Sequence, residues 1–307
     1  MTTRAALFPG QGSQKVGMGR DWAEERPSCR ALFDQAGEVL GLDLAAVCFE
    51  GPDEKLADSR YTQPAVFTVS AAVWNALREE RPGWTFAAAA GHSLGEWTAL
   101  YAAGVLGFRD AVRVLKARGE FIQEACLAHP GGMSAVIGLE EEQIAEIAEA
   151  TGATAANRNA PGQTVFSGSI DRLEAAEEQA RAAGAKRVVR LEVAGAFHSP
   201  LMEPAAQKLR PLLDGIEFGQ PAFPVLSNVT GKPHGDADSI REHMTAQIVS
   251  PVRWIDDVCW MTAQGVDTMV ECGPGRVLSG LVKRIDKTPR LLTMSAVTDL
   301  KQLDEEG

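Results

Sequence analysis

The pentapeptide Gly91-His92-Ser93-Leu94-Gly95 constrains the fold more than any other stretch of this chain. It lies between an apolar run at 86–90 and a helical pattern at 94–104. The glycines on either side of the serine permit a sharp turn from strand to helix, because they carry no Cβ atoms that would collide there. Such a turn projects the serine hydroxyl at a helix N-terminus, where developing negative charge is stabilised. We therefore predict that Ser93 is a nucleophile; a glycine-lined turn with a solvated serine is the alternative.

The surrounding pattern predicts an α/β fold. Short apolar runs alternate with longer helical patterns along most of the chain. Between about 128 and 195 the expected order is β-α-β-β-α-β, which is typical of a ferredoxin-like unit. We predict an α/β-hydrolase-like large domain with a mostly parallel sheet at 1–127 and 196–307, and a small ferredoxin-like α+β subdomain inserted at 128–195.

Composition excludes several function classes. The net charge of −11 disfavours broad attraction to nucleic acid or to anionic lipid. The five cysteines are scattered without a Cys-x-x-Cys pair, which indicates reduced thiols in a cytosolic protein rather than disulfides or a zinc site. The N-terminus lacks the apolar core of a secretory signal, and no run approaches the roughly 18 apolar residues of a membrane span. We expect a cytoplasmic protein with no nucleic-acid partner, no membrane partner and no metal.

A serine nucleophile needs a base, and the chain has five histidines. His92 is adjacent to the serine, but neighbouring side chains on such a turn diverge. His129, His234 and His243 lie in loop-like or polar helical contexts, so we expect them at the surface. His198 lies where the inserted unit returns to the main domain, a joint of the kind where functional sites gather. It is the candidate base, with a buried structural histidine as the alternative.

A second glycine cluster follows the first predicted strand, at 8–14. It does not fit a nucleotide-binding loop, because Lys15 stands where a dinucleotide fingerprint needs glycine and Met18 where a P-loop needs lysine. We interpret it as a loop whose backbone N–H groups point into the site. It would supply a second oxyanion donor beside the N–H of Leu94. The alternative is an ordinary glycine turn.

Several motifs together resemble one family over essentially the whole chain. They are Phe-Pro-Gly-Gln-Gly-Ser-Gln at 8–14, Thr-Gln-Pro-Ala at 62–65, Gly-His-Ser-Leu-Gly-Glu at 91–96, Ala-Arg-Gly at 117–119, Phe-His-Ser-Pro-Leu-Met at 197–202, Gln247 before Ser-Pro-Val-Arg-Trp at 250–254, and Gly-Pro-Gly at 273–275. In this order they resemble the malonyl-CoA:acyl-carrier-protein transacylases. These are the loading enzymes of bacterial fatty-acid synthesis, and they are related to polyketide acyltransferase domains.

The resemblance implies roles for particular residues. Ser93 would be the acylated nucleophile and His198 its general base. The backbone carbonyl of Gln247 would orient the histidine in place of a triad carboxylate. The main-chain N–H groups of Gln11 and Leu94 would form the oxyanion hole.

The resemblance also implies a substrate pocket. Arg118 would pair with the free carboxylate of the substrate, for which a guanidinium fork is well shaped; without the resemblance we would interpret it as a solvated helix arginine. Gln63 and Phe197 would line the pocket. In related acyltransferases, leucine after the nucleophile and Phe-His at the base accompany malonyl rather than methylmalonyl. One departure is Trp97, where many relatives have tyrosine.

The implied activity is malonyl transfer from malonyl-CoA to the phosphopantetheine thiol of an acyl carrier protein. It would proceed by a ping-pong mechanism through a malonyl-serine, without a cofactor and in a monomeric protein. A local basic face would dock the acidic carrier, and its candidates are Lys186, Arg187, Arg190, Lys283 and Arg284. Alternatives are a trans-acting polyketide-synthase acyltransferase, a malonyl-transfer subunit of a malonate-degrading complex, a serine acyl hydrolase or an inert scaffold.

Overall fold

The computed structural model describes residues 2–306; residues 1 and 307, the outer bounds of the predicted large domain, lie outside the described residues. The first half of the chain contains β1 (Arg4–Phe8), α1 (Arg20–Glu25), α2 (Pro27–Leu40), α3 (Leu44–Glu50), α4 (Asp53–Ala57), α5 (Ser59–Glu80), β2 (Phe86–Gly91), α6 (Leu94–Ala102), α7 (Phe108–Ala128), β3 (Gly131–Ile137) and α8 (Glu141–Thr151). The second half contains β4 (Thr154–Ala160), β5 (Gln163–Ser169), α9 (Ile170–Ala182), β6 (Arg187–Arg190), η1 (Pro200–Met202), α10 (Glu203–Asp214), β7 (Leu226–Ser227), β8 (Lys232–Pro233), α11 (Ala237–Ala246), α12 (Trp254–Ala263), β9 (Thr268–Cys272), α13 (Val277–Ile285), β10 (Arg290–Met294) and η2 (Val297–Glu306).

The main sheet is parallel and has the strand order β10-β9-β1-β2. Strand β1 is central, and its side chains enter two different cores. Ala6 and Phe8 belong to the cluster that includes α5 and α7, whereas Ala5 and Leu7 belong to the cluster that includes α12 and α13. Both faces are therefore buried, which explains why β1 reads as a continuous apolar run. The predicted mixed α/β fold with a parallel sheet is confirmed.

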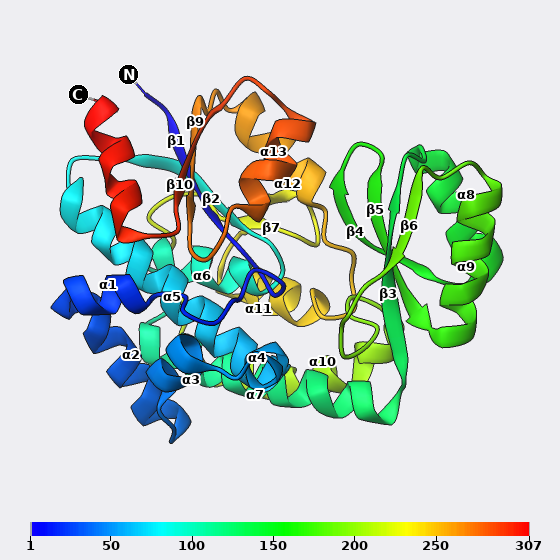
Figure 1. Cartoon of the computed structure of the whole chain (residues 1–307), viewed down its shortest axis with the longest axis horizontal. Coiled ribbons are helices and arrows are strands. Elements are labelled where there is room, and N and C mark those ends of the chain that lie inside the picture. Colours follow the sequence, from blue (N-terminus) through cyan, green and yellow to red (C-terminus); the bar gives the residue numbers. More distant parts are fainter. Residues whose placement is uncertain (1, 307) are drawn as a thin grey trace.

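A second sheet forms the smaller unit drawn in green on the right of Figure 1. It is antiparallel with the order β4-β5-β3-β6. Helices α8 and α9 lie together on its outer side (Figure 1) and bury Ile144, Ile147 and Leu173 against it. Strand β6 ends at Arg190, and the chain beyond it returns to the large unit.

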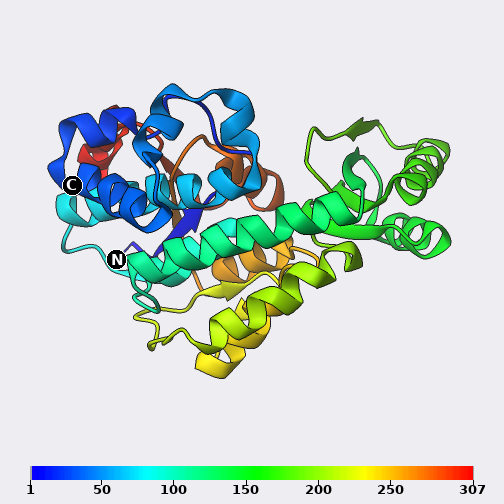
Figure 2. The ribbon, with the colours of Figure 1, turned by 90° about the horizontal axis from the view of Figure 1, so that it is seen from below.

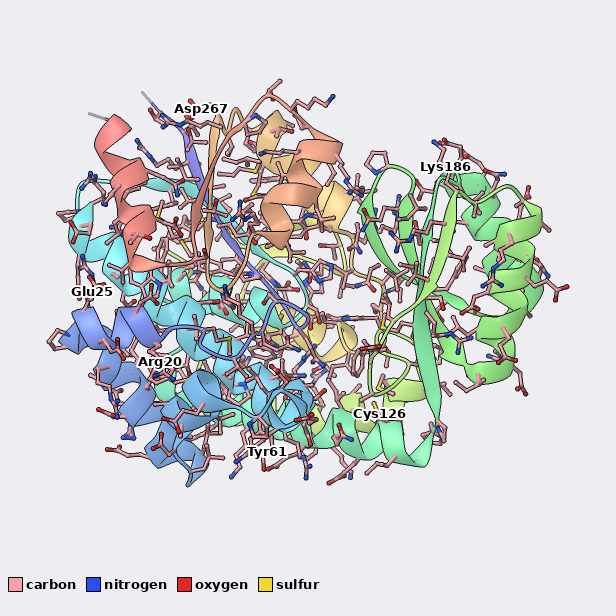
Figure 3. All side chains as sticks on the ribbon, in the orientation of Figure 1. Arg20, Glu25, Tyr61, Cys126, Lys186 and Asp267 are labelled. Atoms are coloured by element: carbon pink, nitrogen blue, oxygen red, sulfur yellow. The ribbon has the colours of Figure 1, made fainter. Side chains whose placement is uncertain are left out.

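The two units are held together at two places. Helix α7 runs the length of the large unit and leads directly into β3 (Figure 2). On the other side, β4 pairs with the segment before α12, where the Val252 amide donates to Ala156 O at 2.8 Å and the Arg158 amide to Val252 O at 2.9 Å. Figure 3 shows Cys126 close to the α7 end that reaches the smaller unit. Across residues 2–306, no helix combines the length and apolar character that a bilayer crossing requires.

Candidate active site

The nucleophile turn has the strained geometry that its glycines predict. Ser93, at the N-cap of α6, adopts φ 51° and ψ −105°, which few side-chain-bearing residues adopt. A Cβ on Gly91 would lie 1.9 Å from Gly95 C, and one on Gly95 would lie 2.0 Å from Phe8 O. Neither position therefore accepts a larger residue, and the turn packs directly on the end of β1.

His198 contacts the serine. Its Nε2 lies 2.8 Å from Ser93 Oγ, and its Nδ1 lies 2.9 Å from Gln247 O and 3.1 Å from Ser250 O. Because carbonyl oxygens only accept, Nδ1 is assigned the proton, which leaves the Nε2 lone pair to accept the serine hydroxyl. The structure thus brings together the predicted nucleophile, the predicted base and the carbonyl predicted to orient that base.

The surroundings of His198 keep its ring neutral. Burial, followed by the positive charge of Arg118, lowers the pKa of His198 to about 3, against the smaller opposing effect of its bond to Gln247 O. A neutral imidazole is the form that can take a proton from serine. The His198 ring can therefore accept a proton at neutral pH.

Arg118 is buried beside the serine rather than solvated on its helix. Its Nη2 donates to Ser93 Oγ at 3.3 Å and to Gln247 Oε1 at 3.0 Å, and its Nη1 donates to Gln63 Oε1 at 2.8 Å. Burial lowers the pKa of Arg118 to about 10, so the guanidinium stays positive at neutral pH. Its partners on these three bonds are neutral, which leaves a buried cation available to an anionic group near Ser93.

A cavity of about 670 Å³ opens at these residues. Its wall contains all of the predicted pocket and oxyanion residues, namely Gln11, Gln63, Leu94 and Phe197. The smaller unit contributes Met133, Asn157, Asn159 and Val165 to the same wall. The cavity therefore lies between the two units, with the nucleophile on the large one.

The Leu94 amide is placed to serve an oxyanion. Three neighbouring amides on the turn have partners, since Ser93 N–H donates to Asn228 Oδ1 at 2.7 Å, Gly95 N–H to His92 O at 2.9 Å and Glu96 N–H to Ser93 O at 3.1 Å. Leu94 is the first residue of α6, where an N–H has no partner within the helix. The side chain of Gln11 turns away to Ser59 Oγ at 3.2 Å, so only its main chain remains for the predicted role.

Sequence reasoning missed the polar side chains behind the turn. The buried Asn228 accepts from Ser93 N–H and donates through Nδ2 to Gly91 O at 2.9 Å and to Asp257 Oδ2 at 2.8 Å. Burial raises the pKa of Asp257 well above its usual range. These contacts hold both ends of the strained turn, and the distance of Asn228 from Ser93 in the chain left no local signal of them.

The expectation that His234 lies at the surface is wrong. It is buried, with Nε2 2.7 Å from Oε1 of the fully buried Glu96. His129 is exposed as expected, and His243 is half-buried. His92 is held by Asn159, with 2.9 Å between Nε2 and Oδ1, and burial lowers its pKa. Among the side chains that the structure describes, no group of three or more His, Cys, Asp or Glu is arranged to hold a metal ion.

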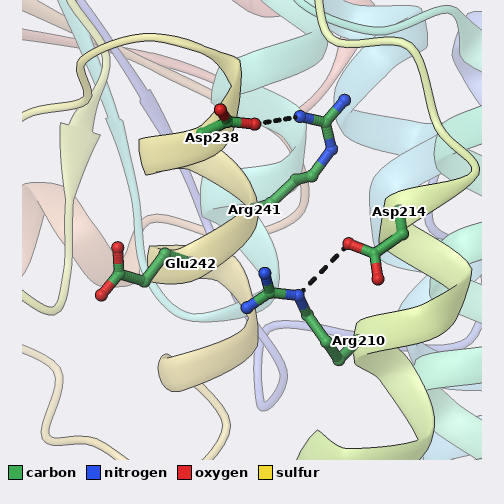
Figure 4. Close-up of a pocket in the computed structure, with 5 residues that line it drawn as sticks. All are labelled: Arg210, Asp214, Asp238, Arg241 and Glu242. Atoms are coloured by element: carbon green, nitrogen blue, oxygen red, sulfur yellow. Dashed lines mark hydrogen bonds and ion pairs between the residues drawn. The ribbon is translucent and has the colours of Figure 1, made fainter.

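A second hollow lies on the surface between α10 and α11 (Figure 4). Its arginines are satisfied by acidic neighbours, Arg210 by Asp214 at 3.2 Å and Arg241 by Asp238 at 2.8 Å. It is lined by these four residues and Glu242 and contains no hydroxyl or thiol nucleophile. The cavity at Ser93 is therefore the candidate active site.

Comparison with known proteins agrees with this site. The family model for the acyl transferase domain matches residues 6–296. The malonyl CoA-acyl carrier protein transacylase of Bacillus subtilis is 43% identical over 300 residues, which cover 96% of this chain and 94% of that protein. The chain belongs to the acyl transferase family and is an acyltransferase. The resemblance noted in its motifs is confirmed.

Solved structures show the same architecture. An acyl carrier protein S-malonyltransferase from Vibrio cholerae superposes with a TM-score of 0.95 at 41% identity, covering 98% of this chain and 100% of that one. A malonyl-transacylase in complex with its type II polyketide-synthase acyl-carrier protein superposes with a TM-score of 0.94 at 42% identity, covering 100% of both chains.

Proposed function

We propose that the protein transfers a malonyl group from malonyl-CoA to the phosphopantetheine thiol of an acyl carrier protein. One observation carries this proposal: a buried guanidinium lies 3.3 Å from the nucleophilic oxygen with neutral partners only. A plain acyl group would leave that charge uncompensated, whereas the carboxylate of a malonyl group would pair with it. The names of the relatives support the same substrate.

The reaction has two half-reactions. Ser93 Oγ attacks the thioester carbonyl while His198 Nε2 takes the hydroxyl proton, and the amides of Leu94 and Gln11 stabilise the oxyanion. The C–S bond then breaks, and His198 returns the proton to the coenzyme A sulfur. The carrier thiol next attacks the malonyl-serine, giving its proton to His198, and Ser93 regains a proton as the ester bond breaks. No cofactor enters either half.

Phe197 and Leu94 would set the size of the acyl group. Both line the cavity, and Phe197 directly precedes the base. An α-methyl group would compete with the Phe197 ring for space. Since one methyl contributes only about 1–3 kcal/mol of discrimination, we expect a preference for malonyl over methylmalonyl rather than full exclusion.

The carrier would dock at the cavity mouth. The five candidate basic residues are all exposed, and Arg190 is paired with Glu177. The guanidinium of Arg284 contacts Oε1 of Gln163, a residue that lines the cavity. Lys186 packs on Gly138, which lies beside Gly162 in the turn just before Gln163. Basic groups of both units thus lie near one opening, which suits an acidic carrier. The similar malonyl-transacylase that was solved with its acyl-carrier protein supports such docking. Because that carrier belongs to a type II polyketide synthase, the same structure also supports a role in polyketide synthesis.

We further propose a domain organisation, an oligomeric state and a cellular location. The large unit is α/β-hydrolase-like and comprises 1–127 and 196–307. The unit at 128–195 is ferredoxin-like, which its strand order β4-β5-β3-β6 with two helices on one side supports. The protein would act as a cytoplasmic monomer.

A competition experiment tests the function. The protein is mixed with malonyl-CoA and a phosphopantetheinylated carrier, and malonyl-carrier and free malonate are followed over time. We expect malonyl-carrier to form faster than malonate. Faster release of malonate would instead identify a serine acyl hydrolase, and no turnover of any acyl-CoA would identify an inert scaffold.

A further inference from the structure

The carboxylate of Glu96 lies at the centre of the buried polar network behind the cavity. Glu96 is in the first turn of α6 and fully buried. Its Oε2 accepts from the side-chain Nε2 of Gln247 at 2.6 Å and from the backbone N–H of Asn228 at 3.2 Å. Its Oε1 lies 2.7 Å from His234 Nε2. None of these contacts takes part in the two half-reactions described above.

The contact with Gln247 has a defined polarity. An ionised carboxylate only accepts, so the Gln247 side chain must present its NH₂ group to Glu96. The amide oxygen then faces the other way, toward Arg118, whose Nη2 donates to it at 3.0 Å. The same NH₂ group also donates to Ser93 O at 3.0 Å. Glu96 therefore sets which end of the Gln247 amide meets the guanidinium.

Glu96 also supplies a negative charge that acts on that guanidinium. Among the described residues, no carboxylate forms an ion pair with Arg118, and its hydrogen-bond partners are neutral. Burial lowers the pKa of Arg118, and the charge of Glu96 is what opposes that shift. Because Glu96 acts across an intervening amide, it stabilises the cation without occupying the position of a substrate carboxylate.

We propose that Glu96 is a positioning residue for recognition of the acyl carboxylate: through the side chain of Gln247 it orients Arg118, and it thereby contributes to the preference for a malonyl over a neutral acyl group. This inference rests on the proposed malonyl transfer. It adds a residue one turn beyond the nucleophile to the determinants of specificity.

The test is the selectivity of the first half-reaction in Glu96→Gln. This variant keeps the side-chain volume but offers both a donor and an acceptor, so the Gln247 amide is no longer held in one orientation. Single-turnover labelling of Ser93 is followed by intact mass with malonyl-CoA and, separately, with acetyl-CoA. We expect the malonyl-to-acetyl rate ratio to fall about tenfold or more, as for loss of a hydrogen bond to a charged group. An equal loss with both substrates, or no loss, would overturn the proposal.

Glu271→Gln is the matched control. Glu271 is also a fully buried glutamate, but it accepts from the amides of Leu278 and Ser279 at the start of α13. We expect Glu271→Gln to leave the malonyl-to-acetyl rate ratio unchanged. A similar fall of the ratio in this variant would show that the loss of any buried negative charge lowers it, and it would overturn the proposal.

A second variant covers the case in which Glu96→Gln does not fold. Gln247→Met removes the amide between Glu96 and Arg118 while keeping the backbone carbonyl that holds His198. The ratio should fall in this variant too, and an unchanged ratio would overturn the proposal. If the wild type takes up no malonyl group at all, the proposed function fails and the role of Glu96 with it.

Discussion

The two units that enclose the cavity differ in where they keep their charged and polar groups. In the large unit, Arg118, Glu96 and Asp257 are buried and surround the nucleophile turn. In the smaller unit, the buried Glu177 is paired with Arg181 and Arg190, whose side chains are exposed. Burial makes charge energetically costly and sensitive to its partners. This difference supports the proposal that the large unit performs the chemistry, whereas the smaller unit contributes part of the cavity wall.

The largest expected effect comes from replacing the proposed base, His198, which belongs to the large unit. Replacing His198 by alanine removes the proton acceptor 2.8 Å from Ser93 Oγ, so we expect acylation to slow by about 10²–10⁴-fold. The rate of malonyl-serine formation, measured by rapid quench and intact mass, checks this. His129→Ala is the matched control, since that histidine is exposed. A small effect at His198 would contradict the assignment of the base.

Arg118→Ala should have the next largest effect and should depend on the substrate. Loss of a charged hydrogen-bond donor to the acyl carboxylate should lower kcat/KM for malonyl-CoA by roughly 10–100-fold, while acetyl-CoA is affected less. Arg241→Ala, in the surface hollow, is the control and should change neither. Equal losses with both acyl groups would show that Arg118 only supports the fold.

The pH dependence of acylation should follow the lowered pKa of His198. The neutral ring is active and the protonated ring is not, so activity falls as pH falls through the pKa. Because burial lowers that pKa to about 3, the rate should stay level as pH falls through about 6.5, the ordinary histidine value. Stopped-flow acylation between neutral pH and pH 5 measures this. A half-loss of rate near 6.5 would contradict the buried, neutral base.

The smallest effect is expected from the smaller unit and should be confined to the second half-reaction. Lys186→Glu places a negative charge on an exposed position at the end of its sheet (Figure 3). We expect a several-fold rise in KM for the carrier that weakens with added salt, because exposed charges are screened. Malonyl-CoA labelling of Ser93 should not change. A slowed first half-reaction would show that the smaller unit affects the chemistry.

The sequence predicted those parts of the site that have local signals. The glycines around Ser93 are required by contacts within the turn and with β1, so the pentapeptide itself predicted the sharp turn that carries the serine. His198 and Gln247 were found through motifs, although they meet only in the folded chain. The burial of His234 was missed because its partner, Glu96, is 138 positions away.

The helices and strands likewise differ in whether a local sequence pattern predicted them. Apart from β10, the strands of the two four-stranded sheets were predicted from apolar patterns, but the helices between residues 20 and 57 were not. Helix α2 did carry a signal, with Pro27 at its start, Gly41 as its left-handed cap and apolar residues at helical spacing between them. Strand β10 pairs only with β9 at the sheet edge, and this pairing depends on tertiary contacts rather than on a local pattern.

The proposed mechanism requires that Ser93 carries the acyl group beside the buried cation. Intact-mass analysis of the protein mixed with malonyl-CoA, alone and as Ser93→Ala, tests it most directly. We expect one malonyl adduct on the wild type, located at Ser93 by peptide mapping, and none on the variant. An unlabelled wild type, or a label that persists in Ser93→Ala, would contradict the account.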